Sequence, residues 1–257
     1  MKNITALALA ALTAGSAYAQ TAASGSTTAA PASDISVAGR FGWAAKNVYL
    51  GKERSSTDGL IQSTVTVESG VPGFAGVNAY LSYYNADNFE RSIALGARTE
   101  WTTVGTVEFG VSRSNTVDGR SSTLAANGFT EASSSRQVYV GLKSKAFLAP
   151  TAHLYYDTDL KQTNFVVSAN KDFEGKELGV PGFDLETKAY LGLVDAKNSK
   201  HDDANSYVYL GASADVTRRI GTGAKVGLGV NWAYNTDSQP LTSGSSVWLK
   251  AYANFKF

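Results

Sequence analysis

Apolar and polar side chains alternate along most of this chain, from Ile35 to the terminal Phe257. A period of two is typical of β-strands that have one apolar and one polar face. Gaps rich in glycine, serine, asparagine and proline interrupt the alternation, and the longest of them covers 114–135. The pattern predicts twelve strands, at 35–50, 60–68, 76–85, 91–101, 105–113, 136–143, 151–157, 162–170, 183–194, 206–216, 224–234 and 246–257.

The last twelve residues alternate without a break up to the terminal carboxylate. One face carries Val247, Leu249, Ala251, Ala253, Phe255 and Phe257. A final strand of this kind, ending on an aromatic residue, resembles the assembly signal of Gram-negative outer-membrane β-barrels. The resemblance implies that the last strand closes against the first. It also implies that Phe255 and Phe257 are read by the barrel assembly machinery.

The strand number and strand lengths agree with that resemblance. Bacterial barrels use an even number of strands, each about 9–11 residues long. We therefore expect an all-β fold, a transmembrane antiparallel up-and-down barrel of about 12 strands over 35–257; a soluble β-sandwich is the rival fold. With both termini in the periplasm, the extracellular gaps are 51–59, 86–90, 114–135, 158–161, 195–205 and 235–245.

Aromatic residues fall near the ends of the expected strands, as they do at membrane–water interfaces. The extracellular girdle is expected to contain Tyr49, Tyr83, Phe109, Tyr156, Phe165, Trp232 and Tyr234. The periplasmic girdle is expected to contain Trp101, Phe183, Phe255 and Phe257.

The N-terminus indicates export. Lys2 and Asn3 precede an apolar run at 4–14, and Ala17-Tyr-Ala19 has the small-x-small form of a cleavage site. We expect a signal peptide at 1–19 and a disordered leader at 20–34, followed by insertion into the cell outer membrane. The chain has no cysteine, so no disulfide framework supports the fold.

Asn47-Val-Tyr-Leu-Gly-Lys-Glu-Arg54 is similar to the first hairpin of a family of uncharacterised outer-membrane proteins, in which strand 1 ends in a Tyr-Val-Phe-Arg-Gly-like turn. This second resemblance implies no activity.

The polar face of the strands predicts the residues that line a pore. They are Arg40, Lys46, Glu68, Arg98, Glu100, Glu108, Lys143, His153, Asp184, Glu186, Lys188, Lys225 and Lys250. With Asp157, Asp215 and Lys256 added, this face carries eight basic and seven acidic residues. Such balance favours a weakly selective polar channel. The alternative is an interior filled by its own side chains, as in barrels of about eight strands.

Other chemistry has little support. Barrel phospholipases carry His-x-Ser-Asn-Gly-Arg, whereas Leu-Tyr-Tyr follows His153 and Asp-Asp-Ala follows His201. Asp157-Thr-Asp159 and Asp202-Asp203 lack calcium-loop spacing and are expected to be solvated loop charges. We predict no catalytic residue, no metal and no cofactor, and a net charge of +1 argues against nucleic acid.

The predicted function is passive diffusion of small hydrophilic solutes across the outer membrane. The expected partners are those solutes, outer-membrane lipids, lipopolysaccharide and the barrel assembly machinery. A non-conducting structural or adhesive barrel that displays its loops is the alternative, with a lipid-modifying barrel enzyme as a third.

Overall fold

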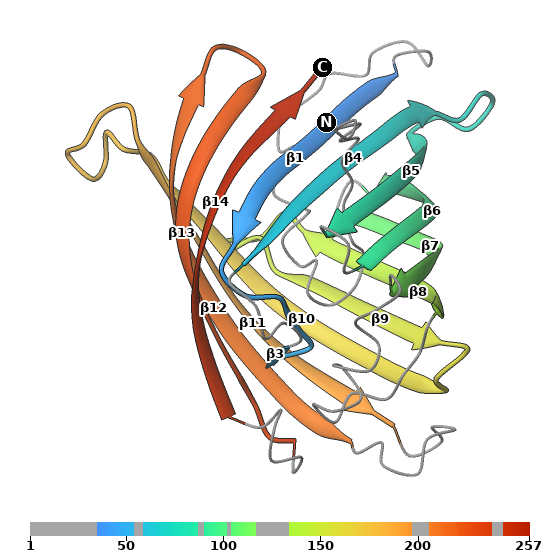
Figure 1. Cartoon of the computed structure of the whole chain (residues 1–257). Coiled ribbons are helices and arrows are strands. Elements are labelled where there is room, and N and C mark those ends of the chain that lie inside the picture. The colour runs from blue at the N-terminus through green and yellow to red at the C-terminus, as the bar shows by residue number, and fades with distance from the viewer. Residues whose placement is uncertain are drawn as a thin grey trace, which may run out of the picture.

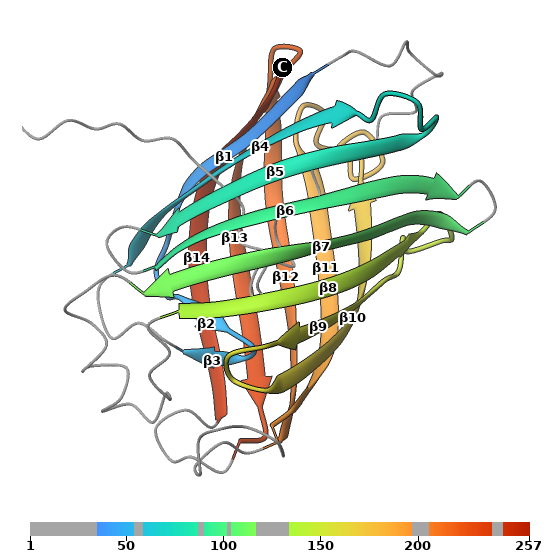
Figure 2. The ribbon, with the colours of Figure 1, turned by 90° about the vertical axis from the view of Figure 1, so that its right-hand side faces the viewer.

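The computed structural model describes residues 35–53, 59–86, 90–101, 104–116, 134–196, 206–237 and 244–257. Within these ranges, twelve strands close into one antiparallel barrel (Figures 1 and 2), which confirms the predicted fold. No helix in the same ranges is long and apolar enough to cross a membrane. The barrel strands are β1 (Ser36–Ala44), β4 (Leu60–Gly70), β5 (Val77–Ala86), β6 (Glu90–Trp101), β7 (Gly105–Thr116), β8 (Ser134–Ser144), β9 (Thr151–Asp157), β10 (Gln162–Phe173), β11 (Asp184–Asp195), β12 (Tyr207–Ile220), β13 (Ala224–Asn235) and β14 (Gly244–Lys256).

The first and last strands close the barrel, as expected. β1 pairs with β14 along a register that sets Phe41 opposite Ala253. The pairing continues to the end of the chain, because the Phe257 amide donates to the Val37 carbonyl at 2.8 Å and the Val37 amide donates back at 3.0 Å. Closure satisfies the backbone groups that an edge strand would leave unpaired.

Most predicted strand limits lie within a few residues of the observed ones, but the first strand is wrong beyond Ala44. The chain there leaves the wall and forms a short hairpin of β2 (Val48–Tyr49) and β3 (Lys52–Glu53). A hairpin keeps the period of two, so alternation alone did not separate it from a longer strand. The signal of the change is Asn47, a polar residue on the expected apolar face, which is buried.

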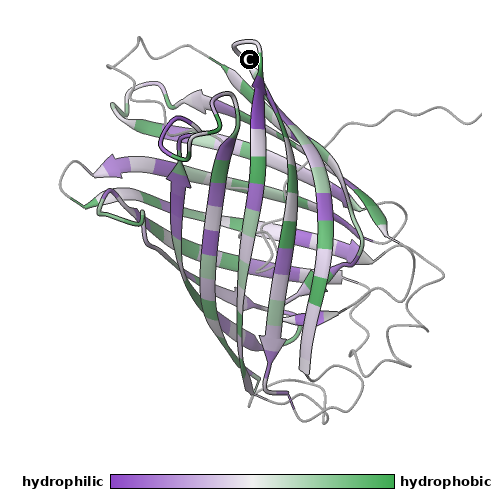
Figure 3. Ribbon diagram, turned by 90° about the vertical axis from the view of Figure 1, so that its left-hand side faces the viewer, coloured by the Kyte–Doolittle hydropathy of each residue, from purple (hydrophilic) through white to green (hydrophobic). Residues whose placement is uncertain are grey.

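The two faces of the wall have opposite character. Large apolar side chains are exposed on the outside, among them Leu228 at 68%, Leu249 at 60% and Phe109 at 59%. Polar, charged and tyrosine side chains alternate with them and point inward, and Figure 3 shows this alternation along the strands. An exposed apolar band around a polar interior is the arrangement of a barrel in lipid.

The two ends of the barrel also differ. We call the end where β1 begins and β14 finishes the terminus end (Figure 1). The opposite end, where β1 leads to β4 and β7 leads to β8, is the loop end. The β2–β3 hairpin lies inside the barrel outline in both views (Figures 1 and 2).

Candidate functional site in the barrel lumen

Several inward polar side chains pair across an intervening strand rather than with their immediate neighbours. Glu108 on β7 and His153 on β9 both lie in register with Gly141 on β8. The glycine has no side chain, so Glu108 Oε1 lies 2.8 Å from His153 Nε2 above it. A Cβ atom at position 141 would lie 2.4 Å from the His153 ring. The absence of a side chain at 141 therefore permits this buried pair.

The same device recurs on the other side of the barrel. Asp215 on β12 and Lys250 on β14 flank Gly229 on β13 in one row. Lys250 Nζ lies 2.8 Å from Asp215 Oδ2, and the two side chains are 8% and 10% exposed. Tyr252 donates to Asp215 Oδ2 at 3.3 Å, and the Arg40 guanidinium lies 3.7 Å from the centre of the Tyr252 ring. These four residues form a continuous polar layer on the wall.

Two tyrosines bridge a pair of glycines in a third row. Tyr80, Gly96, Gly110 and Tyr139 are in register on β5, β6, β7 and β8. The two hydroxyl groups are hydrogen-bonded to each other above the glycines. Both rings therefore lie along the wall, so large side chains occupy less of the lumen than their size would suggest.

Two further ion pairs lie on the inner wall nearer the terminus end. The Arg98 Nε atom lies 2.7 Å from Glu68 Oε1. Lys225 pairs with Glu186 across β12, and Thr217 on that strand donates to the same carboxylate at 3.3 Å. Ion pairs thus neutralise part of the charge on the inner wall, and Arg40, Lys143 and Lys188 lie on the same face.

The structure places most of the predicted pore-lining residues on the inner face of the wall. These are Arg40, Glu68, Arg98, Glu108, Lys143, His153, Glu186, Lys188, Lys225 and Lys250. Three lie elsewhere. Lys46 follows the end of β1 and precedes the hairpin, whereas Glu100 and Asp184 lie at the terminus end, where Glu100 pairs with Lys145 at 2.6 Å and Asp184 accepts from the Gly175 amide at 3.1 Å.

The inward hairpin is the part of the site that the strand pattern missed. Its turn residues, Leu50 and Gly51, both have positive φ, at 49° and 76°. Two such residues are typical of a type I′ turn, which favours glycine and strains leucine. The Asn235 side-chain amide donates to the Gly51 carbonyl at 2.9 Å, and Lys52 pairs with Asp237. Asn235 is the last residue of β13, at the loop end, and Asp237 follows it.

Apolar contacts extend from the hairpin to several parts of the wall. Leu50 is 8% exposed and belongs to a buried cluster that includes Tyr80, Tyr139, Tyr155 and Tyr209. Tyr49 packs against the same cluster, and the Gln137 amide donates to its hydroxyl at 3.3 Å. Placing Tyr49 in the outer aromatic girdle was therefore wrong. The hairpin therefore packs against tyrosines of the inner wall.

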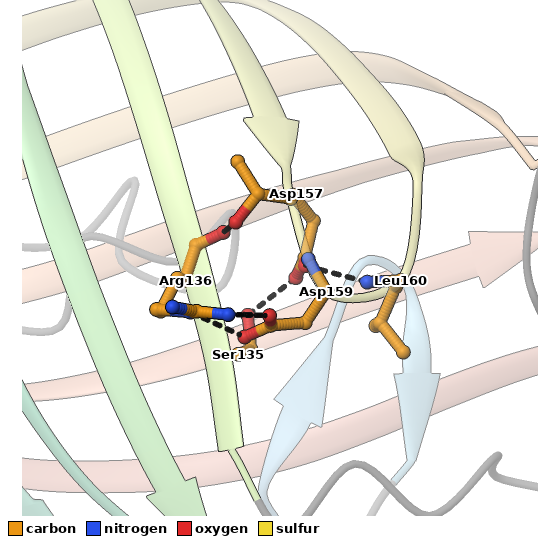
Figure 4. A network of polar contacts seen from close by, with 6 residues as sticks. Ser135, Arg136, Asp157, Asp159 and Leu160 are labelled. Atoms are coloured by element: carbon orange, nitrogen blue, oxygen red, sulfur yellow. Dashed lines mark hydrogen bonds and ion pairs between the residues drawn. The ribbon is translucent and has the colours of Figure 1, made fainter.

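The acidic pair at the β9–β10 turn is also more ordered than a solvated loop. Asp157 is 5% exposed and accepts from the amides of Asp159 and Leu160, each at 2.9 Å. Ser135 donates to the same carboxylate, and Arg136 contacts Asp159 at 2.6 Å (Figure 4). Asp157 therefore caps the turn. No group of three or more potential metal-ligating side chains occurs in the described ranges, and Asp202, Asp203 and His201 lie outside them.

Comparisons with known proteins add little to this geometry. No protein-family model matches the sequence, and neither does any curated protein. Similar solved structures include OccAB2 of Acinetobacter baumannii, with TM-score 0.42, 12% identity and coverage of 90% of this chain and 66% of that one. The structure of OpdK of Pseudomonas aeruginosa with vanillate gives a TM-score of 0.41 at 11% identity. The match covers 90% of this chain and 67% of OpdK.

OccK3 (OpdO) of Pseudomonas aeruginosa gives a TM-score of 0.40 at 10% identity and covers 78% of this chain. The chain spans 57% of OccK3 and 62% of OccK10, less than two thirds of either. At such identities and TM-scores, the likeness carries no argument about family, solute or activity.

Proposed function

We propose that the protein is an outer-membrane channel for passive diffusion of small hydrophilic solutes, with weak charge selectivity and a constriction made by the β2–β3 hairpin. The observation that carries the proposal is the inverted distribution of polarity across one closed wall. Apolar side chains such as Leu228 and Phe109 face outward, while charged pairs such as Asp215–Lys250 face inward. A polar interior within an apolar exterior suits a water-filled path through lipid.

The arrangement of the inner side chains supports an open path through the half near the terminus end. Tyrosines and charged residues lie along the wall above glycines, as Tyr80 does at Gly96 and as Glu108 and His153 do at Gly141. Because acidic and basic residues both lie on the inner wall, and several of them are paired, we expect no ring of one sign to face cations or anions. This balance supports weak selectivity.

The orientation and location follow from the same barrel. Bacterial barrels have short periplasmic turns and longer extracellular loops, so the loop end is assigned to the outside. We include in the proposal signal-peptide-dependent export, assembly by the barrel assembly machinery through Phe255 and Phe257, and contact with outer-membrane lipids and lipopolysaccharide. His153 is bonded to Glu108 and stacks on Tyr155 with ring centres 5.8 Å apart, and we propose no catalytic role for it.

One observation favours the alternative of a non-conducting structural or adhesive barrel. The buried cluster joins Leu50 of the hairpin to side chains from β5, β8 and β12. A hairpin held firmly in that position would block solutes at the loop end. The two proposed functions therefore differ in whether solutes can pass beside the hairpin in its packed position.

Single-channel recording in planar bilayers separates them. We would compare the refolded wild type with a variant in which 47–52 is replaced by glycine and serine. The control replaces the four residues 176–179, in the β10–β11 connection at the other end, with glycine and serine. We expect a small conductance for the wild type, a larger one for the hairpin variant and no change for the control. If neither the wild type nor the hairpin variant conducts, the channel proposal fails and the structural or adhesive barrel replaces it.

A further inference from the structure

Three arginines gather on the outer wall at the loop end. They are Arg91 on β6, Arg113 on β7 and Arg136 on β8, and we call them the arginine patch. All three are exposed and lie on the outward face of their strands. Arg113 is directly opposite Arg136 in the register, and Arg91 is diagonal to Arg113, because it pairs with Asn115, two residues further along β7.

This register places like charges side by side. Residues directly opposite in an antiparallel pair have Cβ atoms about 4.5–5.5 Å apart, and like charges there are destabilising. An anion between the guanidinium groups would reverse the sign of that interaction. Arginine is suited to such a ligand because its planar fork can bind a phosphate group through two parallel hydrogen bonds.

The patch is local rather than part of a charged ring. On the described strands at the loop end, the outward positions of β1, β5, β9 and β13 carry aromatic residues, among them Trp43, Tyr83, Tyr156 and Trp232. Asp195 on β11 is the other outward charge at that end of the described strands. Three basic side chains on three consecutive strands therefore stand out from the other outward positions at this end.

The surface next to the patch, further into the membrane band, is apolar. The next outward residues on β6, β7 and β8 are Ile93, Val111 and Val138, which are 47%, 52% and 45% exposed. A ligand with a charged head and hydrocarbon tails could therefore contact both regions at once, whereas a free anion could use only the arginines.

One member of the patch is held in place by a neighbouring turn. The Arg136 Nε and Nη2 atoms lie 3.1 Å and 2.6 Å from Asp159 Oδ1 (Figure 4). Asp159 neutralises part of the local charge, and the remaining charge of the patch and Asp159 is still positive. The ion pair also orients Arg136 along the outer rim.

We propose that the arginine patch is a binding site for the phosphate groups of an anionic lipid of the outer leaflet, whose acyl chains lie along Ile93, Val111 and Val138. Lipopolysaccharide, with its phosphorylated lipid A, has this chemistry. The inference rests on the proposed outer-membrane location and orientation, and it is independent of whether the lumen conducts.

The test measures lipid binding by native mass spectrometry of the refolded mature chain in detergent. The probes are bisphosphorylated lipid A, its monophosphorylated form and inorganic phosphate. We expect the Arg91→Gln/Arg113→Gln/Arg136→Gln variant to bind bisphosphorylated lipid A about tenfold more weakly or worse, since charge-assisted hydrogen bonds are lost. The monophosphorylated form should bind the wild type more weakly. Asp159→Asn should bind more tightly than the wild type, because it removes the competing carboxylate.

The matched control is Lys171→Gln/Arg218→Gln, which removes outward basic charge at the terminus end. It should change the affinity by less than about twofold. Equal lipid A affinity for the wild type and the triple variant would overturn the proposal. Inorganic phosphate that binds as tightly as lipid A would also overturn it, since the apolar rows would then contribute nothing.

Two readouts keep folding and function separate from lipid binding. Heat-modifiable migration must show a folded barrel for each variant. If the triple variant does not fold, the lipid A affinity of Arg113→Lys is compared with that of Arg113→Gln. Unchanged single-channel conductance in the triple variant is expected, because its side chains lie outside the lumen. A lost conductance with unchanged lipid binding would overturn the assignment of these arginines.

Discussion

Glu108 and His153 belong to strands that are not neighbours, yet their side chains lie 2.8 Å apart above Gly141. The two side chains can meet because the residue between them on the wall is a glycine. The same relationship links Asp215 and Lys250 above Gly229. Sequence changes at such a glycine should act on the two residues that cover it.

We expect Gly141→Ala to destabilise the barrel by about 1–3 kcal/mol, the usual cost of forcing extra atoms into a packed site. The new Cβ would lie 2.4 Å from His153 Cδ2 and 2.9 Å from Glu108 Cγ. Urea midpoints of the refolded protein measure the effect. In a double-mutant cycle with His153→Ala, the alanine at 141 should cost much less. A full cost in both backgrounds would mean that the strain lies elsewhere.

A charge placed on the outer wall should be far more harmful than one placed on the inner wall. Leu191 is 50% exposed on the outer face of β11, so Leu191→Arg should cost about 2–4 kcal/mol if the position lies near the bilayer midplane. Gln62 is half-buried on the inner face of β4, and Gln62→Arg is the matched control. We expect a lower urea midpoint for the first variant and little change for the second. Equal losses would contradict a lipid-facing outer wall.

Selectivity should respond to the Arg98–Glu68 pair, because each residue neutralises the other. Glu68→Gln leaves a positive charge on the wall and should favour anions, and Arg98→Gln leaves a negative charge and should favour cations. Reversal potentials in a salt gradient measure the shift. Glu100→Gln at the terminus end is the control, since its side chain is 59% exposed and its charge is more screened by water. Shifts of the same sign in both pair variants would argue against wall-charge control.

Deletion of Phe257 should impair barrel assembly much more than export. The residue contributes two backbone hydrogen bonds to Val37 and leaves its ring 80% exposed, where it packs near Phe255 at 5.8 Å between ring centres. Loss of the closing contacts should reduce the heat-modifiable form in outer-membrane fractions, while the amount of exported chain stays the same. Phe257→Tyr should behave like the wild type. A normal amount of folded barrel in the deletion strain would count against the closing-strand role.

Strand positions and wall faces could be predicted from the sequence because both depend on a local period of two. The alternation puts neighbours such as Tyr190 and Leu191 on opposite faces, and the structure agrees. Contacts across the lumen could not be predicted in the same way. Pairing Glu108 with His153 requires the register of three strands, and that register depends on the stagger of the whole barrel. The β2–β3 hairpin was missed because folding back preserves the alternation.

Asn235 and Gly51 are separated by 184 residues, although a hydrogen bond joins them. The hairpin lies early in the chain, whereas two of the residues that contact it, Asn235 and Asp237, lie at the end of β13 or just after it. These contacts cannot form until the C-terminal strands are in place, because they join residues far apart in the sequence. An incompletely assembled barrel would leave the hairpin without these two contacts, so the position of the hairpin reports whether the chain has finished folding.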